Sequence, residues 1–186
     1  MIHREPPRHV FNKLNFDTTL SNYDRVKVLQ EYGGIYLDFD VLVTQSFDSF
    51  RKHKCTLGRE LPTHLNAGVI ICAPEEPFLY LWLNSYFDDY KPIWAYNSGA
   101  VAHKLSQRYP HLIHIEETRM HHPSPKNITQ IWGPHYYPWK KNYVLHTWIR
   151  KAGLEYFPNE TSIRTMNNTF GRVACDVYYG SEKLLT

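Results

Sequence analysis

The segment that most constrains the fold spans residues 32–43 and reads YGGIYLDFDVLV. Its apolar run predicts a buried strand, and the glycine pair near its start allows a close turn of the backbone. Because side chains alternate along a strand, Asp38 and Asp40 would then lie on one face of it. Unpaired carboxylates beside a core are costly, so the pair requires a cation or contact with water. Such hard oxygen ligands suit Mg²⁺ or Mn²⁺, with phosphate oxygens as further ligands.

Strands and helices alternate along the chain, which predicts a layered α/β fold. Periodicity and capping residues predict helices over residues 21–32, 78–87 and 98–109, and strands over residues 55–58, 66–73, 111–116 and 143–148. In an arbitrary protein two aspartates this close are more often surface or turn residues than ligands. In an open α/β sheet, however, ligands bind at the carboxyl ends of the strands, which favours a functional role for this pair.

Length and composition narrow the class of protein further. A chain of 186 residues fits one domain but is short for a complete nucleotide-sugar enzyme. The net charge is only +3, and no part of the sequence is a dense block of Lys and Arg. We therefore expect no nucleic-acid partner. Three cysteines, none at metal-binding spacing, leave at least one thiol unpaired within the chain. Among the eleven histidines, zinc bound by His121 and His122 with His111 or His114 is a weak alternative.

The sequence also bears on the cellular location. It contains no apolar run of transmembrane length and no signal-peptide core, so membrane association is expected only through a segment outside this sequence. Asn127, Asn159 and Asn167 each begin a tripeptide that fits the glycosylation pattern. These tripeptides favour a lumenal or secreted protein, and we expect the Golgi lumen or another part of the secretory pathway.

Several motifs together resemble one known family. They are residues 21–25 (SNYDR), residues 31–40 (EYGGIYLDFD), residues 65–68 (LNAG), residues 94–99 (WAYNSG) and residues 146–148 (HTW). These stretches are similar to the glycosyltransferases with a DXD-containing sugar-binding region. This family includes animal α-1,4-galactosyltransferase and α-1,4-N-acetylglucosaminyltransferase, and the fungal initiating α-1,6-mannosyltransferase.

The resemblance implies a GT-A fold, with a mixed sheet flanked by helices, and retention of the anomeric configuration. The N-terminal nucleotide-binding strand of that fold is expected to be missing from this sequence. We divide the chain into an extended connecting segment over residues 1–20, a glycosyltransferase core over residues 21–150, and a C-terminal extension over residues 151–186 that packs on the core. The implied activity is that of a hexosyltransferase. It moves a sugar from a nucleotide diphosphate, UDP foremost, to a glycan or glycolipid acceptor.

The resemblance also assigns site residues. Asp40 should bind a Mn²⁺ or Mg²⁺ ion directly, Asp38 should contact both the donor and the ion, and His146 is the candidate third metal ligand. The residues expected to bind the donor are Asn22, Arg25, Tyr36, Asp38, Asn66, Ala67, Gly68, Asn97, Ser98 and Gly99. No protein nucleophile or catalytic base is assigned, so the departing diphosphate is expected to help deprotonate the acceptor.

Two rival interpretations remain open. In the family an aspartate usually stands where this chain has Asn22, and this change, with the short N-terminus, points to a noncatalytic or truncated relative that binds a glycan or a partner. A nucleotide-sugar hydrolase would use the same metal site. Helix capping by Asn97 and Ser98 and a plain turn at residues 66–68 are the structural alternatives to donor binding.

Overall fold

The computed structural model describes residues 16–154 and 157–181, and its contacts divide the chain into two compact units. Unit 1 comprises Met1–Tyr36 and Phe50–Ile115, and unit 2 comprises Leu37–Ser49 and Glu116–Thr186. No single point in the sequence marks this division, because the chain passes between the units three times. The expected boundaries at residues 20 and 150 stay a prediction, and residues 1–15 lie outside the described part.

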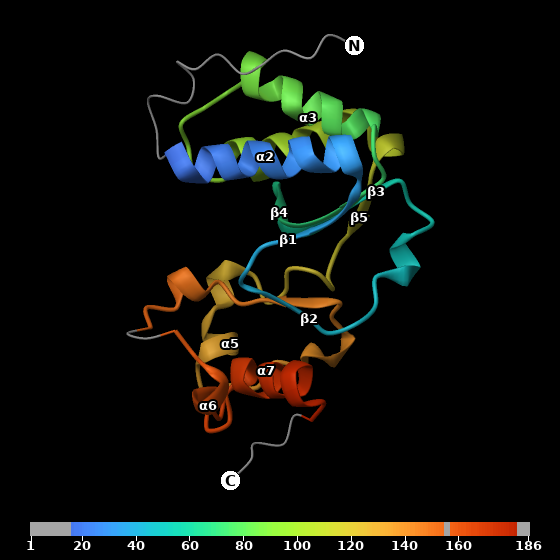
Figure 1. Ribbon diagram of the computed structural model, residues 1–186. Coiled ribbons are helices and arrows are strands. Elements are labelled where there is room, and N and C mark those ends of the chain that lie inside the picture. Colours follow the sequence, from blue (N-terminus) through green and yellow to red (C-terminus); the bar gives the residue numbers. More distant parts are fainter. Residues whose placement is uncertain (1–15, 155–156, 182–186) are drawn as a thin grey trace. The chain divides into compact units, whose positions relative to one another are not determined.

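Unit 1 is a four-stranded sheet with helices packed against it, and its strand order is β1-β4-β3-β5 (Figure 1). Its elements are α2 (Phe16–Tyr32), β1 (Gly34–Leu37), β3 (Cys55–Leu61), β4 (His64–Cys72), α3 (Pro77–Asp88), a π-helical turn (Tyr96–Ala100), α4 (Val101–Arg108) and β5 (His114–Glu116). Helices α2 and α3 lie side by side over the sheet. Their fully buried side chains, Val26, Phe78, Leu79 and Trp82, form much of the core with Leu57 and Ile70 of the strands.

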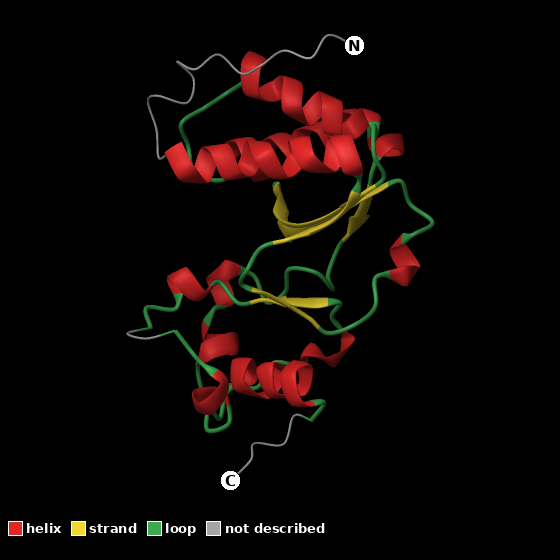
Figure 2. Cartoon of the chain, in the orientation of Figure 1, coloured by secondary structure: helices red, strands yellow, loops and turns green. Residues whose placement is uncertain are grey.

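Unit 2 is built on a short antiparallel ladder of β2 (Val41–Val43) and β6 (Val144–His146). Val41 lies opposite His146, and Val43 lies opposite Val144. Helices α5 (Thr129–Trp132), α6 (Glu160–Ile163) and α7 (Thr169–Tyr179) complete the unit, as the colouring of Figure 2 shows. Its core contains Ile131, Trp139, Leu145, Phe170 and Val173.

The predicted α/β class is confirmed: the structure has a mixed sheet flanked by helices, compatible with a glycosyltransferase fold. The predicted helix 78–87 and the strand from residue 55 are confirmed as α3 and β3. Helix α2 begins five residues earlier than expected, at Phe16. The strand expected over residues 111–116 is shorter, because Pro110–Leu112 forms a 3-10 turn before β5.

One central prediction about the strands is wrong. Residues 32–43 do not form one buried strand, because β1 ends at Leu37 and residues 38–40 turn into β2. The N–H of Val41 donates to the carbonyl oxygen of Asp38 (3.2 Å), which closes that turn. β1 is also an edge strand of the described sheet, and Ile35 is 50% exposed. Aspartate favours turns over strand interiors, so the acidic pair ends the strand instead of continuing it.

The glycine pair ends helix α2 as the sequence predicts. Gly33 has a φ of 66°, and its N–H donates to the Leu29 carbonyl (2.8 Å). A Cβ at this position would lie 2.5 Å from Cδ of Pro74, so the approach of the β4–α3 connection also requires glycine here.

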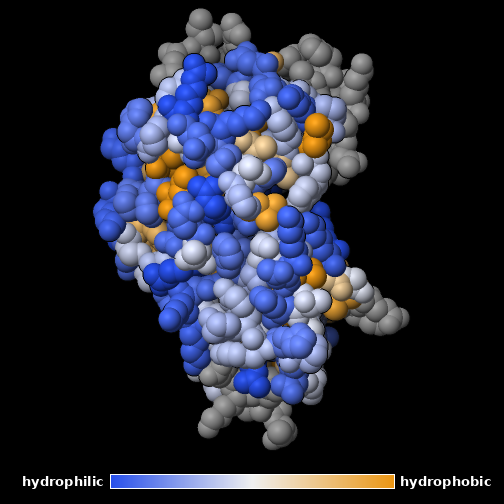
Figure 3. Space-filling view, turned by 180° about the vertical axis from the view of Figure 1, so that it is seen from behind, coloured by the Kyte–Doolittle hydropathy of each residue, from blue (hydrophilic) through white to orange (hydrophobic). Residues whose placement is uncertain are grey.

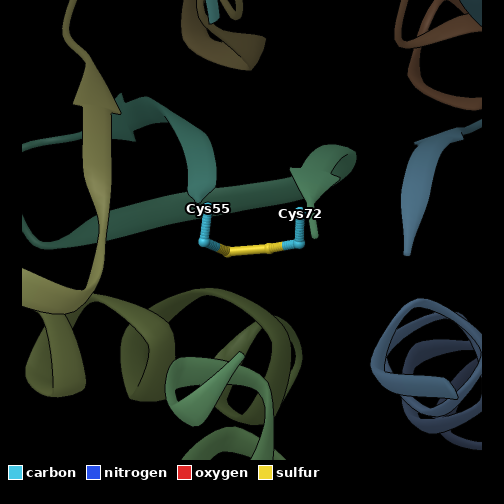
Figure 4. The surroundings of a disulfide bond; sticks show 2 residues. All are labelled: Cys55 and Cys72. Atoms are coloured by element: carbon cyan, nitrogen blue, oxygen red, sulfur yellow. A yellow bond between two sulfur atoms is a disulfide. The ribbon is translucent and has the colours of Figure 1, made fainter. Parts of the chain in front are cut away.

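A disulfide joins the β3–β4 hairpin of unit 1. Cys55 and Cys72 lie opposite each other in the β3–β4 register and are bonded (Figure 4), whereas Cys175 is a buried free thiol. The sequence predicted that at least one cysteine is unpaired within the chain, and the structure confirms this. Such a bond persists in oxidising compartments, which agrees with a secretory protein.

We expect removal of this disulfide to destabilise the protein. The bond closes a loop with a sequence separation of 17, and a loop of that length contributes about 3 kcal/mol to the free energy of unfolding. Denaturant titrations of the wild type and of Cys55→Ala/Cys72→Ala, each with and without reductant, measure the effect. Reductant should lower the wild-type midpoint and leave that of the double variant unchanged; a wild-type midpoint insensitive to reductant would contradict the pairing.

Within the described residues, no helix is both long and apolar enough to span a membrane. The face seen in Figure 3 is mostly hydrophilic, with apolar side chains in small groups.

Candidate functional site

An acidic cluster in unit 2 brings together Asp38, Asp40 and His146. Each of them offers a ligand atom, and these atoms all lie within 4.8 Å of one another. The aspartates come from the turn between β1 and β2, and His146 ends β6. Because His146 pairs with Val41 in the ladder, the β2–β6 register places its imidazole beside the turn. Two carboxylates and an imidazole nitrogen are a donor set that fits Mn²⁺ or Mg²⁺ with phosphate oxygens as further ligands.

Asp40 is the most firmly held member of this cluster. Its Oδ1 lies 3.2 Å from Nε2 of His146, and its Oδ2 accepts from the N–H of Ile149 (3.3 Å). Its carbonyl oxygen accepts from both the N–H and the hydroxyl of Thr147, each at 2.9 Å. Burial acts to raise the pKa of Asp40, but His146 and the Ile149 N–H outweigh it and lower that pKa. The carboxyl group is therefore ionised at neutral pH, the state that a metal ligand requires.

His146 is buried and is held in place by aromatic neighbours. Its ring stacks on Trp148 with centroids 3.7 Å apart, and the ring of His121 meets it edge-on at 5.6 Å. His121 is fully buried, and neither of its ring nitrogens has a hydrogen-bond partner among the residues that the structure describes. Burial lowers the pKa of His121 well below its usual value, and the nearby His146 and His122 lower it further. His121 is therefore neutral and does not add charge to the cluster.

His121 was missed as a neighbour of the site, because 25 residues separate it from His146 and no local spacing connects them. The alternative zinc site receives no support from the geometry. His114 stacks instead on His53, with centroids 3.8 Å apart. Among the described residues, the three-membered cluster of potential ligands is Asp38, Asp40 and His146, and it includes none of the histidines proposed for zinc.

In unit 1 the structure brings together three of the predicted donor-binding residues: Arg25, Tyr36 and Ala67. Nη1 of Arg25 donates to the Ala67 carbonyl (2.9 Å), and the guanidinium lies 4.5 Å from the centroid of the Tyr36 ring. Nε and Nη2 donate to the carbonyl and the hydroxyl of Ser21, both at 3.1 Å. These contacts hold the guanidinium in one orientation.

Arg25 and Tyr36 also line a pocket of about 540 Å³ beside the middle of α2. Its other lining residues are Leu20, Ser21, Asp24 and Val28. Asn22 is half-buried on the same helix and does not line this pocket. The pocket thus combines an apolar wall with a fixed cation, which suits a ligand with a flat or apolar part and a negative group.

The strand expected over residues 66–73 is confirmed as part of β4, and the alternative of a plain turn at residues 66–68 is not formed, because Asn66 lies inside β4 where the β3–β4 register is irregular. The side chain of Asn66 is buried, its Nδ2 donates to Glu60 Oε2 (2.8 Å), and its Oδ1 accepts from the Gly68 N–H (2.6 Å). This amide supports the irregular strand from within the protein. The Ala67 carbonyl is the group of this segment that reaches the Arg25 guanidinium.

Asn97, Ser98 and Gly99 lie in the π-helical turn that precedes α4. The side chain of Asn97 accepts from the Lys91 N–H (3.1 Å) and donates to the Lys91 carbonyl (2.7 Å). Its backbone carbonyl accepts from Nε1 of Trp82 (2.8 Å). A Cβ on Gly99 would approach the Leu65 carbonyl to 2.9 Å, so the turn packs closely on β4. The Asn97 amide thus holds a loop together and caps no helix.

Comparison with known proteins agrees with the resemblance. Residues 3–57 match the family described as "Glycosyltransferase sugar-binding region containing DXD motif". Among curated proteins, "Glucan organizing enzyme 1" of Cryptococcus neoformans is 28% identical over 165 residues, which cover 80% of this chain and 45% of that protein. "Lactosylceramide 4-alpha-galactosyltransferase" of Pan troglodytes is 22% identical over 155 residues, 72% of this chain and 42% of that protein.

An uncharacterized protein of Arabidopsis thaliana is 36% identical over 98 residues, 47% of this chain and 15% of that protein. The chain thus spans less than half the length of each of these relatives. No solved structure matches it. The resemblance to the DXD glycosyltransferases is confirmed, because residues 3–57 match the family model of that region.

Proposed function

We propose that this chain is the site-bearing part of a metal-dependent, retaining hexosyltransferase with a GT-A arrangement. It would transfer a sugar from a nucleotide diphosphate, UDP as the first candidate, to a hydroxyl of a glycan or glycolipid. The observation that carries the proposal is the convergence of Asp38, Asp40 and His146, whose ligand atoms lie within 4.8 Å of one another, two of them in the matched region. The disulfide and the named glycan enzyme among the relatives support a secretory location, which we propose to be the Golgi lumen.

Each residue of the acidic cluster has a distinct proposed role. Asp40, ionised and held by Ile149 and His146, would bind the ion directly. His146 would offer a ring nitrogen as a further ligand, and Asp38 would bind the ion through water and contact the donor. The ion, Mn²⁺ or Mg²⁺, supplies positive charge to the diphosphate of the donor. No protein nucleophile is required, because front-side transfer lets the departing diphosphate take the proton of the acceptor hydroxyl.

The Arg25 pocket is the proposed donor-binding element of unit 1. The clamped guanidinium would bind donor oxygens, and Tyr36 would supply the surface beside it. Asn22, on the same helix but outside the pocket lining, would hydrogen-bond a sugar hydroxyl. The amides of Asn66 and Asn97 are occupied within the protein. We therefore propose that residues 66–68 and 97–99 serve the donor through backbone groups and, at Ser98, through a hydroxyl.

The proposal is tested by incubating the purified chain, and a version extended upstream, with Mn²⁺ and a panel of UDP- and GDP-sugars. Metal-dependent release of nucleotide is the expected result, and addition of glycan acceptors should increase it. If neither version binds any nucleotide in the presence of the metal, the proposed activity is wrong. Release that no acceptor increases would instead indicate a hydrolase.

The second candidate is a noncatalytic relative, and the observation that favours it is Asn22 in place of an acidic residue. Such a protein would bind glycans without releasing nucleotide. The variant Asn22→Asp distinguishes the enzyme from the noncatalytic relative. If the variant releases nucleotide and the wild type does not, the loss of the acidic residue at this position explains the missing activity.

Arg25→Lys is expected to weaken nucleotide binding about tenfold, because a lysine keeps the charge but cannot bond Ser21 and Ala67 while facing the donor. Calorimetric titration with UDP and Mn²⁺ measures the change in Kd. The matched control is Arg59→Lys in the same unit, whose guanidinium bonds the Pro62 carbonyl and the His103 ring. If Arg25→Lys and the control bind UDP with equal affinity, Arg25 is not part of the donor site.

A further inference from the structure

Two basic residues follow β6 in a turn that is fastened to the acidic cluster. Ile149–Lys151 forms a 3-10 turn, and its first N–H is the group bonded to Oδ2 of Asp40. Thr147, two residues before Ile149, donates to the Asp40 carbonyl oxygen through both its N–H and its hydroxyl. Arg150 directly follows Ile149, whose N–H contacts Asp40. The backbone position of Arg150 is therefore fixed relative to the residue proposed to bind the ion.

The guanidinium of Arg150 lies over the ring of Phe39, 5.4 Å from its centroid. Phe39 stands between Asp38 and Asp40 in the chain and is 75% exposed. Lys151 lies in the same way near Trp148, with Nζ 5.6 Å from the ring centroid, and Trp148 stacks on His146. Both cations thus rest on rings that adjoin the proposed ligands.

The contact of Arg150 with Phe39 is weak, so Arg150 can give it up to bind a group that interacts with it more strongly. Among the described residues the Arg150 guanidinium forms no hydrogen bond or ion pair, and the ring is its contact. A cation over an exposed ring gains little free energy, because both groups remain in contact with water. A charge-assisted hydrogen bond to a phosphate oxygen gains more, and arginine can form two in parallel.

Charge balance identifies the kind of partner. The formal charges of two carboxylates and one divalent ion cancel, so the acidic cluster alone leaves the charge of a bound diphosphate uncompensated. When the bond between the anomeric carbon and the diphosphate oxygen breaks, its electron pair stays on that oxygen, and the negative charge of the diphosphate grows. The acceptor oxygen forms the new bond, and its proton passes to the departing diphosphate. Positive groups aimed at that charge stabilise the transition state most.

We propose that Arg150 leaves the ring of Phe39 and binds the diphosphate of the donor, with Lys151 as a second cation beside it. This inference rests on the proposed function, because it assigns a residue to the same metal site. It goes beyond the DXD motif, since the family match ends at residue 57 and does not include Arg150.

The test uses inorganic pyrophosphate as the probe, in equilibrium dialysis with Mg²⁺, so that the sugar and the base play no part. Arg150→Met should weaken pyrophosphate binding about tenfold, and Arg150→Lys should recover part of the loss. Binding of Mn²⁺ without pyrophosphate, followed by electron paramagnetic resonance, should be unchanged in both variants. This second readout separates loss of the anion contact from collapse of the cluster.

The matched control is Arg172→Met on α7. Arg172 also lies over an aromatic ring, 5.6 Å from the centroid of Tyr136, and it bonds the Asn167 side chain. The Arg172→Met variant should bind pyrophosphate with the affinity of the wild type. Wild-type affinity in Arg150→Met, or no binding of pyrophosphate by the wild type with metal, would overturn the inference.

Failure of this inference and failure of the proposed function give different results. Normal release of nucleotide together with wild-type pyrophosphate affinity in Arg150→Met overturns the role of Arg150 alone. Pyrophosphate binding that depends on Arg150, together with no nucleotide release from any sugar donor, supports the diphosphate site and overturns sugar transfer.

Discussion

Asp40→Asn should lower metal-dependent nucleotide release by about 100-fold or more, because it removes the charged ligand from the centre of the acidic cluster. The substitution keeps the shape of the side chain, but the amide is neutral and one of its two acceptors becomes a donor. That donor would face either Nε2 of His146 or the N–H of Ile149. The local fold should survive, since Thr147 bonds the backbone carbonyl of Asp40 and not its carboxylate.

The measurement is nucleotide release over a range of Mn²⁺ concentrations, with Mn²⁺ affinity followed independently. A matched control is Asp176→Asn on α7, which removes one carboxylate from unit 2 outside the cluster. The control should behave as the wild type does. If Asp40→Asn binds Mn²⁺ and releases nucleotide at wild-type levels, Asp40 is not a metal ligand and the proposed mechanism is wrong.

Trp82→Ala should produce the largest loss of stability, about 3–5 kcal/mol in the free energy of unfolding. Trp82 is fully buried between the helices and the sheet of unit 1, and its ring packs edge-on against Phe78 at 6.0 Å. Its Nε1 also holds the Asn97 carbonyl, so truncation leaves both a cavity and a carbonyl without that donor. A domain is stable by only about 5–15 kcal/mol, so the variant is expected to be barely folded.

Denaturant titration measures this loss, and two further variants separate its causes. Trp82→Phe keeps most of the ring volume and loses the bond to Asn97, so it should cost less than the alanine variant. Trp94→Ala removes a tryptophan that is 66% exposed in the same unit and should change stability by at most about 0.5 kcal/mol. Equal losses for Trp82→Ala and Trp94→Ala would contradict the core position of Trp82.

Local patterns predicted the elements that are stabilised locally. The apolar spacing of α3, the proline at its start and the end of α2 at Gly33 are all visible in short windows of sequence. The pairing of Cys55 with Cys72 was not predictable in this way, because it depends on the register of two strands. For the same reason the irregular β3–β4 register beside Asn66 was not predictable, although the strand itself was.

The acidic pair Asp38 and Asp40 shows both what the sequence determines and what depends on the tertiary structure. The sequence by itself determined that Asp38 and Asp40 lie near each other toward the end of an apolar strand, and, through the resemblance, that His146 is their candidate partner. Only the tertiary structure decided that the pair lies in a turn and that the β2–β6 ladder sets His146 against Asp40. Hydrophobic periodicity is a property of neighbouring residues, whereas contacts between distant segments depend on which strands pair and in which register.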